Sequence, residues 1–260
     1  METQIIIYLS IFLFFFGLLI GSFLNVVAIR MLKGESISFP PSHCTTCKHP
    51  LKPWDLIPLL SYLSLKGKCR YCHARVSPAY FWGELTTGLL FAWAGWMFGW
   101  QLETIVALFI ISIFVVIVQT DLREMIIPNK VIAFGVASGI VLRIFIHELP
   151  LWNYGLSLVL GGGIIYLISA VSSFILKKEA MGGGDVKLFA FVGLMLGFKL
   201  LLLSIFLASL AGFLIGVILL LSGRTKAGAY IPFGPYIALG SLITYGWGNS
   251  IIAWYLAFLP

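Results

Sequence analysis

Long apolar runs separated by short polar connections dominate the chain. A transmembrane helix needs about 20 mostly apolar residues, whereas the strands of a membrane β-barrel would show alternating segments of about 10 residues. The runs here are continuous, so the pattern predicts helices. We therefore expect an all-α polytopic membrane protein with about eight transmembrane helices, within the stretches Ile5–Ile29, Tyr80–Phe98, Thr104–Val118, Ile126–Ile146, Tyr154–Leu176, Val186–Gly197, Leu200–Leu221 and Tyr236–Leu259.

The first apolar stretch does not have the pattern of a cleaved signal peptide. Glu2 stands where a basic n-region would be, and the run from Ile5 to Ile29 is too long for an h-region and has no small-x-small cleavage site. We expect it to remain as transmembrane helix 1, over residues 1–29. The polar connection over residues 30–79 predicts a small cytosolic domain, and residues 80–260 then form a membrane domain with helices 2–8.

The composition agrees with a membrane protein. Hydrophobic residues make up 60% of the chain and charged residues 10%, and the mean hydropathy is +1.02. Soluble globular proteins are about 45–50% apolar and about 25% charged, so this chain would expose more apolar surface than water tolerates. A soluble enzyme, a disordered regulator and a secreted disulfide scaffold are therefore excluded.

The basic residues indicate how the helices are oriented. With eight helices, all but Arg143 and Lys199 of the 17 Lys and Arg residues lie on or beside odd-numbered connections. Because Lys and Arg collect on the cytosolic side of a membrane protein, we expect the odd connections in the cytosol and both termini outside. The net charge of +7 then reflects orientation in the lipid bilayer, and we expect no nucleic-acid partner.

All four cysteines lie in the polar connection, as two C-x-x-C pairs with 21 residues between them: Cys44, Cys47, Cys69 and Cys72. This spacing is typical of a tetrahedral four-thiolate zinc site. A cytosolic location disfavours disulfides. A segment of about 50 residues with a small hydrophobic core also needs a bound metal ion or a similar constraint to fold stably. Structural Zn²⁺ is the favoured interpretation, with two disulfides or redox dithiols as alternatives.

Two acidic residues, Asp121 and Asp185, stand where an apolar run meets the cytosolic edge. Ionisable groups at such a position are costly and by default mark function. Each also has a structural interpretation. Asp185, after three glycines, could cap a helix N-terminus, and Asp121 could pair with Arg123.

Helix length favours a functional role for Asp185. The stretch Val186–Gly197 rises only about 18 Å, short of the roughly 30 Å of a bilayer core, and Lys199 then marks the outer face. Asp185 is therefore expected below the cytosolic surface, on irregular backbone that must line water or be enclosed by protein. Beside Asp121 it would form an aspartic-protease pair that shares one proton.

Motifs in a fixed order carry a resemblance to a known family. They are GSFLNVV at Gly21–Val27 with Arg30, the two C-x-x-C pairs, RVSPAY at Arg75–Tyr80 with Glu84, the stretch Asp121–Asn129, G-x-G-D at Gly182–Asp185 with Val186 and Lys187, and IPFGPY at Ile231–Tyr236. Over nearly the whole chain they resemble the bacterial type IV prepilin leader peptidases, which are G-x-G-D membrane aspartic peptidases.

The resemblance implies an aspartic endopeptidase of the bacterial cytoplasmic (inner) membrane, with an active site that faces the cytosol. Its substrates would be type IV prepilins or pseudopilins, cleaved after the Gly that ends a basic leader. The catalytic pair would be Asp121 and Asp185. The supporting loop would contain Gly182, Gly183, Gly184 and Lys187.

Many members of the family are bifunctional, so the resemblance also implies N-methylation of the new N-terminal residue with S-adenosylmethionine. The four-cysteine domain is linked to that step. No residue is assigned to the methyl donor, because residues 30–79 contain no glycine-rich strand–helix motif for a nucleotide.

Two positions depart from or vary within the family pattern. Asn129 stands where the family commonly has Asp, and Gly183 occupies the variable position of G-x-G-D. Asp121 itself matches, so we expect proteolysis to persist.

Two other classes of function are open to the sequence. One is a proton-coupled transporter with Asp121 and Asp185 as a relay, but we find no inverted repeat with paired broken helices. The other is a membrane-anchored zinc ribbon that binds nucleic acid or a secretion partner, for which Tyr71 alone offers little aromatic stacking.

Overall fold

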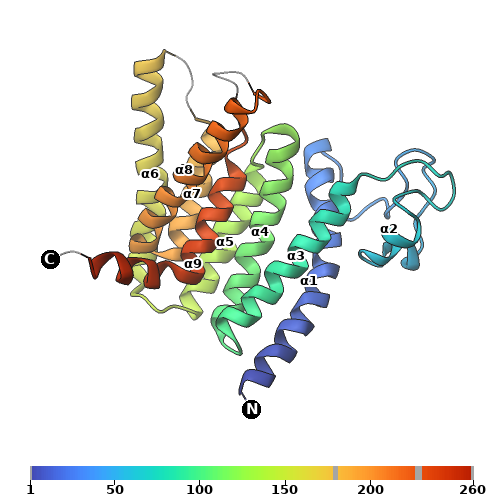
Figure 1. The fold of residues 1–260 in the computed structure, drawn as a ribbon, viewed down its shortest axis with the longest axis horizontal. Coiled ribbons are helices and arrows are strands. Elements are labelled where there is room, and N and C mark those ends of the chain that lie inside the picture. The colour runs from blue at the N-terminus through green and yellow to red at the C-terminus, as the bar shows by residue number, and fades with distance from the viewer. Residues whose placement is uncertain (1, 178–180, 226–229, 259–260) are drawn as a thin grey trace. The chain divides into compact units, whose positions relative to one another are not determined.

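The computed structural model describes residues 2–177, 181–225 and 230–258, and over these residues the fold is all-helical apart from two isolated β-bridges (Figure 1). The helices are α1 (Glu2–Lys33), a short 3-10 helix η1 (Pro53–Leu56), α2 (Leu60–Ser64), α3 (Pro78–Phe98), α4 (Leu102–Glu124), α5 (Asn129–Phe145), α6 (Leu151–Leu176), α7 (Gly183–Leu196), α8 (Phe198–Leu221) and α9 (Gly234–Leu256).

Each predicted apolar stretch overlaps one of the eight long helices, so the all-α fold is confirmed. Among the described residues, four segments are long and apolar enough to cross a membrane: Thr3–Lys33, Leu102–Glu124, Leu151–Ile175 and Phe198–Leu221. The number of spans beyond these four stays a prediction. Three residues used in the sequence argument, Lys178, Lys226 and Leu259, lie outside the described part of the chain.

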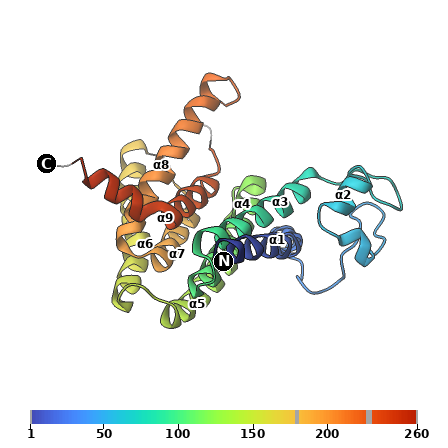
Figure 2. The ribbon, with the colours of Figure 1, turned by 60° about the horizontal axis from the view of Figure 1, so that its bottom comes forward.

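The chain divides into two compact units, Met1–Gln119 and Thr120–Pro260. The division falls inside α4, and the domain boundaries after residues 29 and 79 stay predictions. Within the first unit, α3 packs along α1 (Figure 2).

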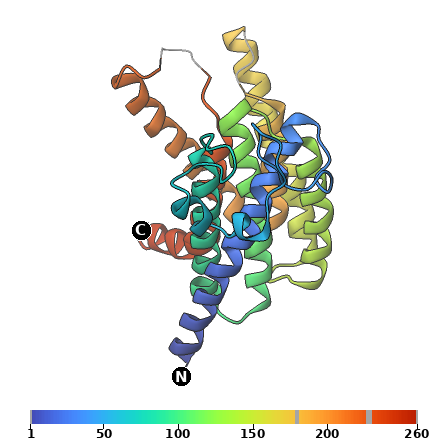
Figure 3. The same cartoon turned by 90° about the vertical axis from the view of Figure 1, so that its right-hand side faces the viewer.

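Glycines bring α1 and α3 close together. A Cβ atom placed on Gly21 would lie 2.9 Å from the Thr87 side chain and 3.0 Å from Glu84 Cα. Asn25, at the same interface, donates from Nδ2 to the Tyr80 carbonyl oxygen at 3.0 Å. The segment between α1 and α3, which faces the viewer in Figure 3, carries η1, α2 and all four cysteines.

In the second unit, α7 is the central helix. It contacts α5, α6, α8 and α9, and most of its residues are buried. Gly161 of α6 and Gly193 of α7 allow the two backbones to touch, because a Cβ atom on either would overlap a carbonyl group of the other helix. Asp185 therefore lies in the first turn of a helix that contacts the other helices of its unit on several sides.

The far end of α7 is fixed by a buried arginine. Arg143 donates from Nε to the Met195 carbonyl oxygen at 3.0 Å, and its guanidinium lies 5.0 Å from the centre of the Tyr154 ring. Asn153 Oδ1 accepts from the Phe198 amide at 3.1 Å, at the start of α8. Cationic and polar groups thus satisfy the backbone at the corner between α7 and α8.

Candidate active site and metal centre

Asp121 lies in the last turn of α4 and is only 4% exposed. Its Oδ2 accepts a hydrogen bond of 2.8 Å from the backbone amide of Gly234, the first residue of α9. The first amides of a helix have no partner within the helix and carry partial positive charge. The start of α9 is therefore a fixed donor for the Asp121 carboxylate, and Asp121 bonds to this amide instead of the predicted partner Arg123.

The contact between Asp121 and Gly234 leaves no room for a side chain. A Cβ atom on Gly234 would lie 2.8 Å from Asp121 Oδ2 and 3.2 Å from its Cγ. The sequence argument used the stretch Ile231–Tyr236 only as one of the family motifs. The structure places a helix start there, and the amide of Gly234 is a site group that the sequence argument missed.

Asp185 lies in the first turn of α7 and is 9% exposed. The N-cap residue is Gly182, so the interpretation of Asp185 as a helix cap is wrong. Gly183 and Gly184 belong to the helix, and of the predicted supporting loop only Gly182 precedes it. The Asp185 carboxylate lies close enough to Asp121 for the two to interact electrostatically.

The three glycines before Asp185 have different surroundings. A Cβ atom on Gly184 would lie 2.9 Å from Ile127 Cβ, whereas one on Gly183 would have no neighbour within 4 Å. Packing therefore requires a glycine at position 184 but not at position 183. This agrees with the motif G-x-G-D, in which position 183 is the variable one. Gly182 faces the Asp185 carboxylate, since its Cβ atom would lie 3.7 Å from Oδ2.

Lys187 connects α7 to α5. Its Nζ donates to Asn129 Oδ1 at 2.8 Å, and Asn129 is the first residue of α5. The departure from the common Asp therefore keeps an oxygen acceptor for Lys187, although it removes a negative charge.

The four cysteines form one cluster. The Sγ atoms of Cys44, Cys47, Cys69 and Cys72 all lie within 4.8 Å of one another, and Cys44 and Cys72 are 3.8 Å apart. Tetrahedral Zn–S bonds of about 2.3 Å give sulfur–sulfur distances of about 3.8 Å, whereas a disulfide bond is about 2.05 Å long. All four thiols are free, so the cluster has the geometry of a metal site.

The two C-x-x-C pairs have matching backbone turns. The Lys48 amide donates to the Cys44 carbonyl oxygen at 2.9 Å, and the His73 amide donates to the Cys69 carbonyl oxygen at 3.0 Å. Both Lys48 and His73 have positive φ angles. Each pair is thus a knuckle that presents two sulfur atoms to one point.

Backbone hydrogen bonding favours a thiolate in the cluster. The pKa of the Cys44 thiol is lowered to about 6, chiefly by a backbone hydrogen bond from Cys47. A backbone hydrogen bond from Ala74 lowers the pKa of Cys72, but burial and the neighbouring sulfur atoms outweigh it and raise this pKa to about 11. One thiol therefore ionises first and receives hydrogen bonds from the others, and a bound cation would favour the ionised form of all four.

Asp55 ties the second knuckle to η1. Its carboxylate accepts from Arg70 Nε at 2.6 Å and from the Tyr71 hydroxyl at 3.1 Å. Burial raises the pKa of the Asp55 carboxyl, but the bond from Arg70, together with those from the Lys52 amide and Tyr71, outweighs burial and holds this pKa below its usual value. Asp55 is therefore ionised at neutral pH.

Glu84, to which the sequence argument gave no role, is a buried carboxylate that joins the cysteine segment to α3. It is 8% exposed, and its Oε2 accepts from the Leu59 amide at 2.9 Å. Ser22 of α1 lies near the Glu84 side chain. The nearest signal in the sequence was the position of Glu84 after the RVSPAY motif.

Comparison with known proteins shows the family of this chain. Residues 15–98 match the bacterial peptidase A24 N-terminal domain, and residues 108–217 match the type IV leader peptidase family. A Bacillus subtilis prepilin leader peptidase/N-methyltransferase is 41% identical over 244 residues, which cover 94% of this chain and 96% of the relative. The chain belongs to the type IV leader peptidase family.

Other family members with the same name are more distant. The Pseudomonas aeruginosa protein is 32% identical over 265 residues, covering 93% of this chain and 91% of the relative. The Neisseria gonorrhoeae protein is 31% identical over 267 residues, covering 92% of each. No solved structure matches the chain. Family membership confirms the resemblance based on the sequence motifs.

Proposed function

We propose that this chain is a prepilin leader peptidase that cleaves the basic leader of type IV prepilins or pseudopilins after Gly, at the cytosolic face of the bacterial inner membrane. The observation that carries the proposal is the buried pair of Asp121 and Asp185, with a helix amide held against one carboxylate. The sequence left two alternatives open, a proton-coupled transporter and a membrane-anchored zinc ribbon. Membership of the type IV leader peptidase family favours neither of them.

The pair can perform peptide-bond hydrolysis as a general base and a general acid. Two carboxylates in a buried site hold one proton between them. The ionised carboxylate takes a proton from the attacking water while its partner gives the shared proton to the scissile carbonyl. The bond from Gly234 stabilises the charged form of Asp121, so we assign Asp121 as the base and Asp185 as the acid before attack.

We further propose that the four cysteines hold one structural Zn²⁺, which folds the segment between α1 and α3. The relatives' names support a second activity, N-methylation of the new N-terminal residue, with S-adenosylmethionine as the methyl donor. The multi-pass topology with eight spans, a cytosolic site and both termini outside belongs to the same proposal, supported by the distribution of basic residues.

The test uses the full-length protein in liposomes with a model prepilin that has a Gly–Phe junction. Mass spectrometry should find the free leader and a mature helix with Phe as its first residue. Added S-adenosylmethionine should then increase the mass of the mature helix by one methyl group. An intact prepilin after prolonged incubation with the folded protein would refute the peptidase proposal.

A further inference from the structure

A hollow of about 540 Å³ lies at the end of the segment between α1 and α3, within the first unit. We call it the basic pocket, because Lys66, Lys68 and Arg75 line it and none of the described residues around it is acidic. The other residues that line it are Tyr62, Gly67, Val76, Ser77 and Pro78. Its volume is within the range of about 300–1,000 Å³ that is typical of ligand sites. The lining favours an anionic ligand.

Backbone hydrogen bonds hold the segments that carry the three cations. Gly67 donates to the Tyr62 carbonyl oxygen at 2.8 Å and accepts from the Val76 amide at 2.8 Å. The turn is closely packed, because a Cβ atom on Gly67 would lie 2.9 Å from the Tyr62 ring. Lys68 and Arg75 stand opposite each other in an isolated antiparallel bridge. The basic pocket is therefore built on a hydrogen-bonded turn at the edge of the second cysteine knuckle.

The positive charges of the basic pocket are not neutralised by ion pairs. Among the ion pairs of the described residues, none includes Lys66, Lys68 or Arg75. Like charges directly opposite each other in a bridge are destabilising, so Lys68 and Arg75 repel each other. An anion bound between the cations would remove this repulsion.

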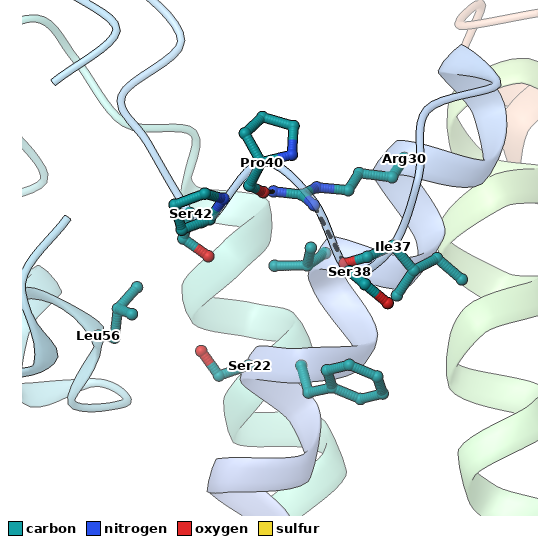
Figure 4. Close-up of a pocket in the computed structure, with 10 residues that line it drawn as sticks. Ser22, Arg30, Ile37, Ser38, Pro40, Ser42 and Leu56 are labelled. Atoms are coloured by element: carbon teal, nitrogen blue, oxygen red, sulfur yellow. Dashed lines mark hydrogen bonds between the residues drawn. The ribbon is translucent and has the colours of Figure 1, made fainter. Parts of the chain in front are cut away.

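A second hollow in the same unit gives a useful contrast. It has a volume of about 220 Å³, lies beside α1 and is lined by the cation Arg30 (Figure 4). Arg30 is 7% exposed and donates to the carbonyl oxygens of Ser36 at 2.9 Å, Ile37 at 3.0 Å and Pro40 at 2.6 Å. The charge of Arg30 is therefore used to hold the backbone through charge-assisted hydrogen bonds. This hollow does not offer a cation to a ligand in the way that the basic pocket does.

The basic pocket lies near the end of a candidate membrane span. Pro78, which lines it, is the first residue of α3. The Tyr80 carbonyl oxygen accepts from Asn25 of α1, and the span formed by α1 ends at Lys33, about two turns beyond Asn25. This span has 31 residues, more than the roughly 20 that cross a hydrocarbon core. Its last turn carries Arg30 and Lys33, which are costly inside hydrocarbon, so this end lies at the level of the lipid headgroups.

Exposed leucines directly precede the basic pocket in the chain. Leu60 and Leu63 of α2 are 65% and 59% exposed, and their spacing places them on one face of the helix. Lys66 follows soon after the end of α2. Apolar side chains beside cations are typical of a surface that lies in the headgroup region of a bilayer. A soluble phosphate ester would not contact the leucines, so the combination favours a lipid.

We propose that the basic pocket binds the phosphate group of an anionic phospholipid between Lys66, Lys68 and Arg75. Leu60 and Leu63 would then lie against the lipid layer. The bound lipid would hold the segment that carries the four cysteines against the surface of the bilayer.

The experiment titrates the full-length, zinc-loaded protein in detergent micelles with lipid and measures the bound lipid by native mass spectrometry. Phosphatidylglycerol should bind more tightly than phosphatidylcholine, which has no net charge, and more tightly than glycerol 3-phosphate, which has no acyl chains. Lys66→Gln should weaken the binding of phosphatidylglycerol about fivefold, the factor that corresponds to about 1 kcal/mol per cation at an anionic surface.

Lys48→Gln is the matched control and should leave the affinity unchanged. Lys48 is also an exposed lysine with a positive φ angle beside a cysteine knuckle, but it lies outside the basic pocket. Leu63→Ser should weaken the binding of phosphatidylglycerol and leave that of glycerol 3-phosphate unchanged. Zinc content and melting temperature equal to those of the wild type check that each variant is folded.

Several results would overturn the assignment. Equal affinities for the two lipids, or equal losses in Lys66→Gln and Lys48→Gln, would show that no specific headgroup site exists. Glycerol 3-phosphate that binds as tightly as the lipid would assign the pocket to a soluble phosphate, and displacement of the lipid by S-adenosylmethionine would assign it to the methyl donor. The measurement is of binding alone, so its failure would leave the proposed cleavage untouched.

Discussion

The contact between Gly234 and Asp121 leads to a sharp prediction for Gly234→Ala. The added methyl group would lie 2.8 Å from Asp121 Oδ2 and 3.3 Å from its Cβ, both closer than ordinary contact. The carboxylate must move away and lose its bond from the helix amide. Alanine is otherwise compatible with this position, since Gly234 is the first residue of a helix and does not have a positive φ angle.

The expected loss follows from the bond that is broken. A hydrogen bond to a charged group is worth about 1.5–3 kcal/mol. If the bond stabilises the base in the reacting state, its loss lowers the rate by about 10- to 150-fold. Because this bond joins two groups of the protein itself, we expect the decrease in kcat and little change in KM.

The assay is steady-state cleavage of a model prepilin in liposomes, with thermal unfolding of each variant measured in parallel. Gly163→Ala is the matched control, because a Cβ atom on Gly163 has no neighbour within 4 Å and the residue lies in α6 of the same unit. Wild-type kcat in folded Gly234→Ala would refute the role given to the amide, and equal losses in both variants would refute the steric reasoning.

Two further predictions concern the glycine motif and the cysteine cluster. Gly184→Ala should lower the rate of cleavage and cost about 1–3 kcal/mol of stability, because the added methyl group overpacks against Ile127. Gly183→Ala should retain wild-type activity, because its methyl group has no neighbour within 4 Å. Cleavage rates and melting temperatures of the two variants test this difference. Replacement of Cys44 and Cys69 by serine should release about one Zn²⁺ per chain and disrupt the domain while cleavage persists in part, and metal analysis that finds no zinc in the wild type would contradict the proposed site.

Hydrophobic patterning predicted the eight long helices of the described residues, but not the short helices η1 and α2. The short apolar run that begins at Val186 became α7, and its 14 residues confirm that this helix is shorter than a full span. The cysteine spacing likewise predicted a cluster that the structure forms. Both signals are local, because helix length and knuckle spacing depend on neighbouring residues.

The site contacts that were missed depend on distant residues. The Gly234 amide bonds to Asp121, which is 113 positions away in the chain, and a backbone group leaves no signature in side-chain chemistry. Glu84 binds the Leu59 amide over 25 positions for the same reason. The exact start of α7 was also missed, since three successive glycines give no indication of which one begins the helix.

Cleavage of a Gly–Phe model prepilin by Asp121→Asn and Asp185→Asn in liposomes tests the central claim most directly. Each substitution keeps the shape of the side chain but prevents the exchange of a proton between the two groups. We expect both variants to insert and fold like the wild type and to release no leader. Leader release at the wild-type rate from either folded variant would contradict the assignment of the aspartate pair.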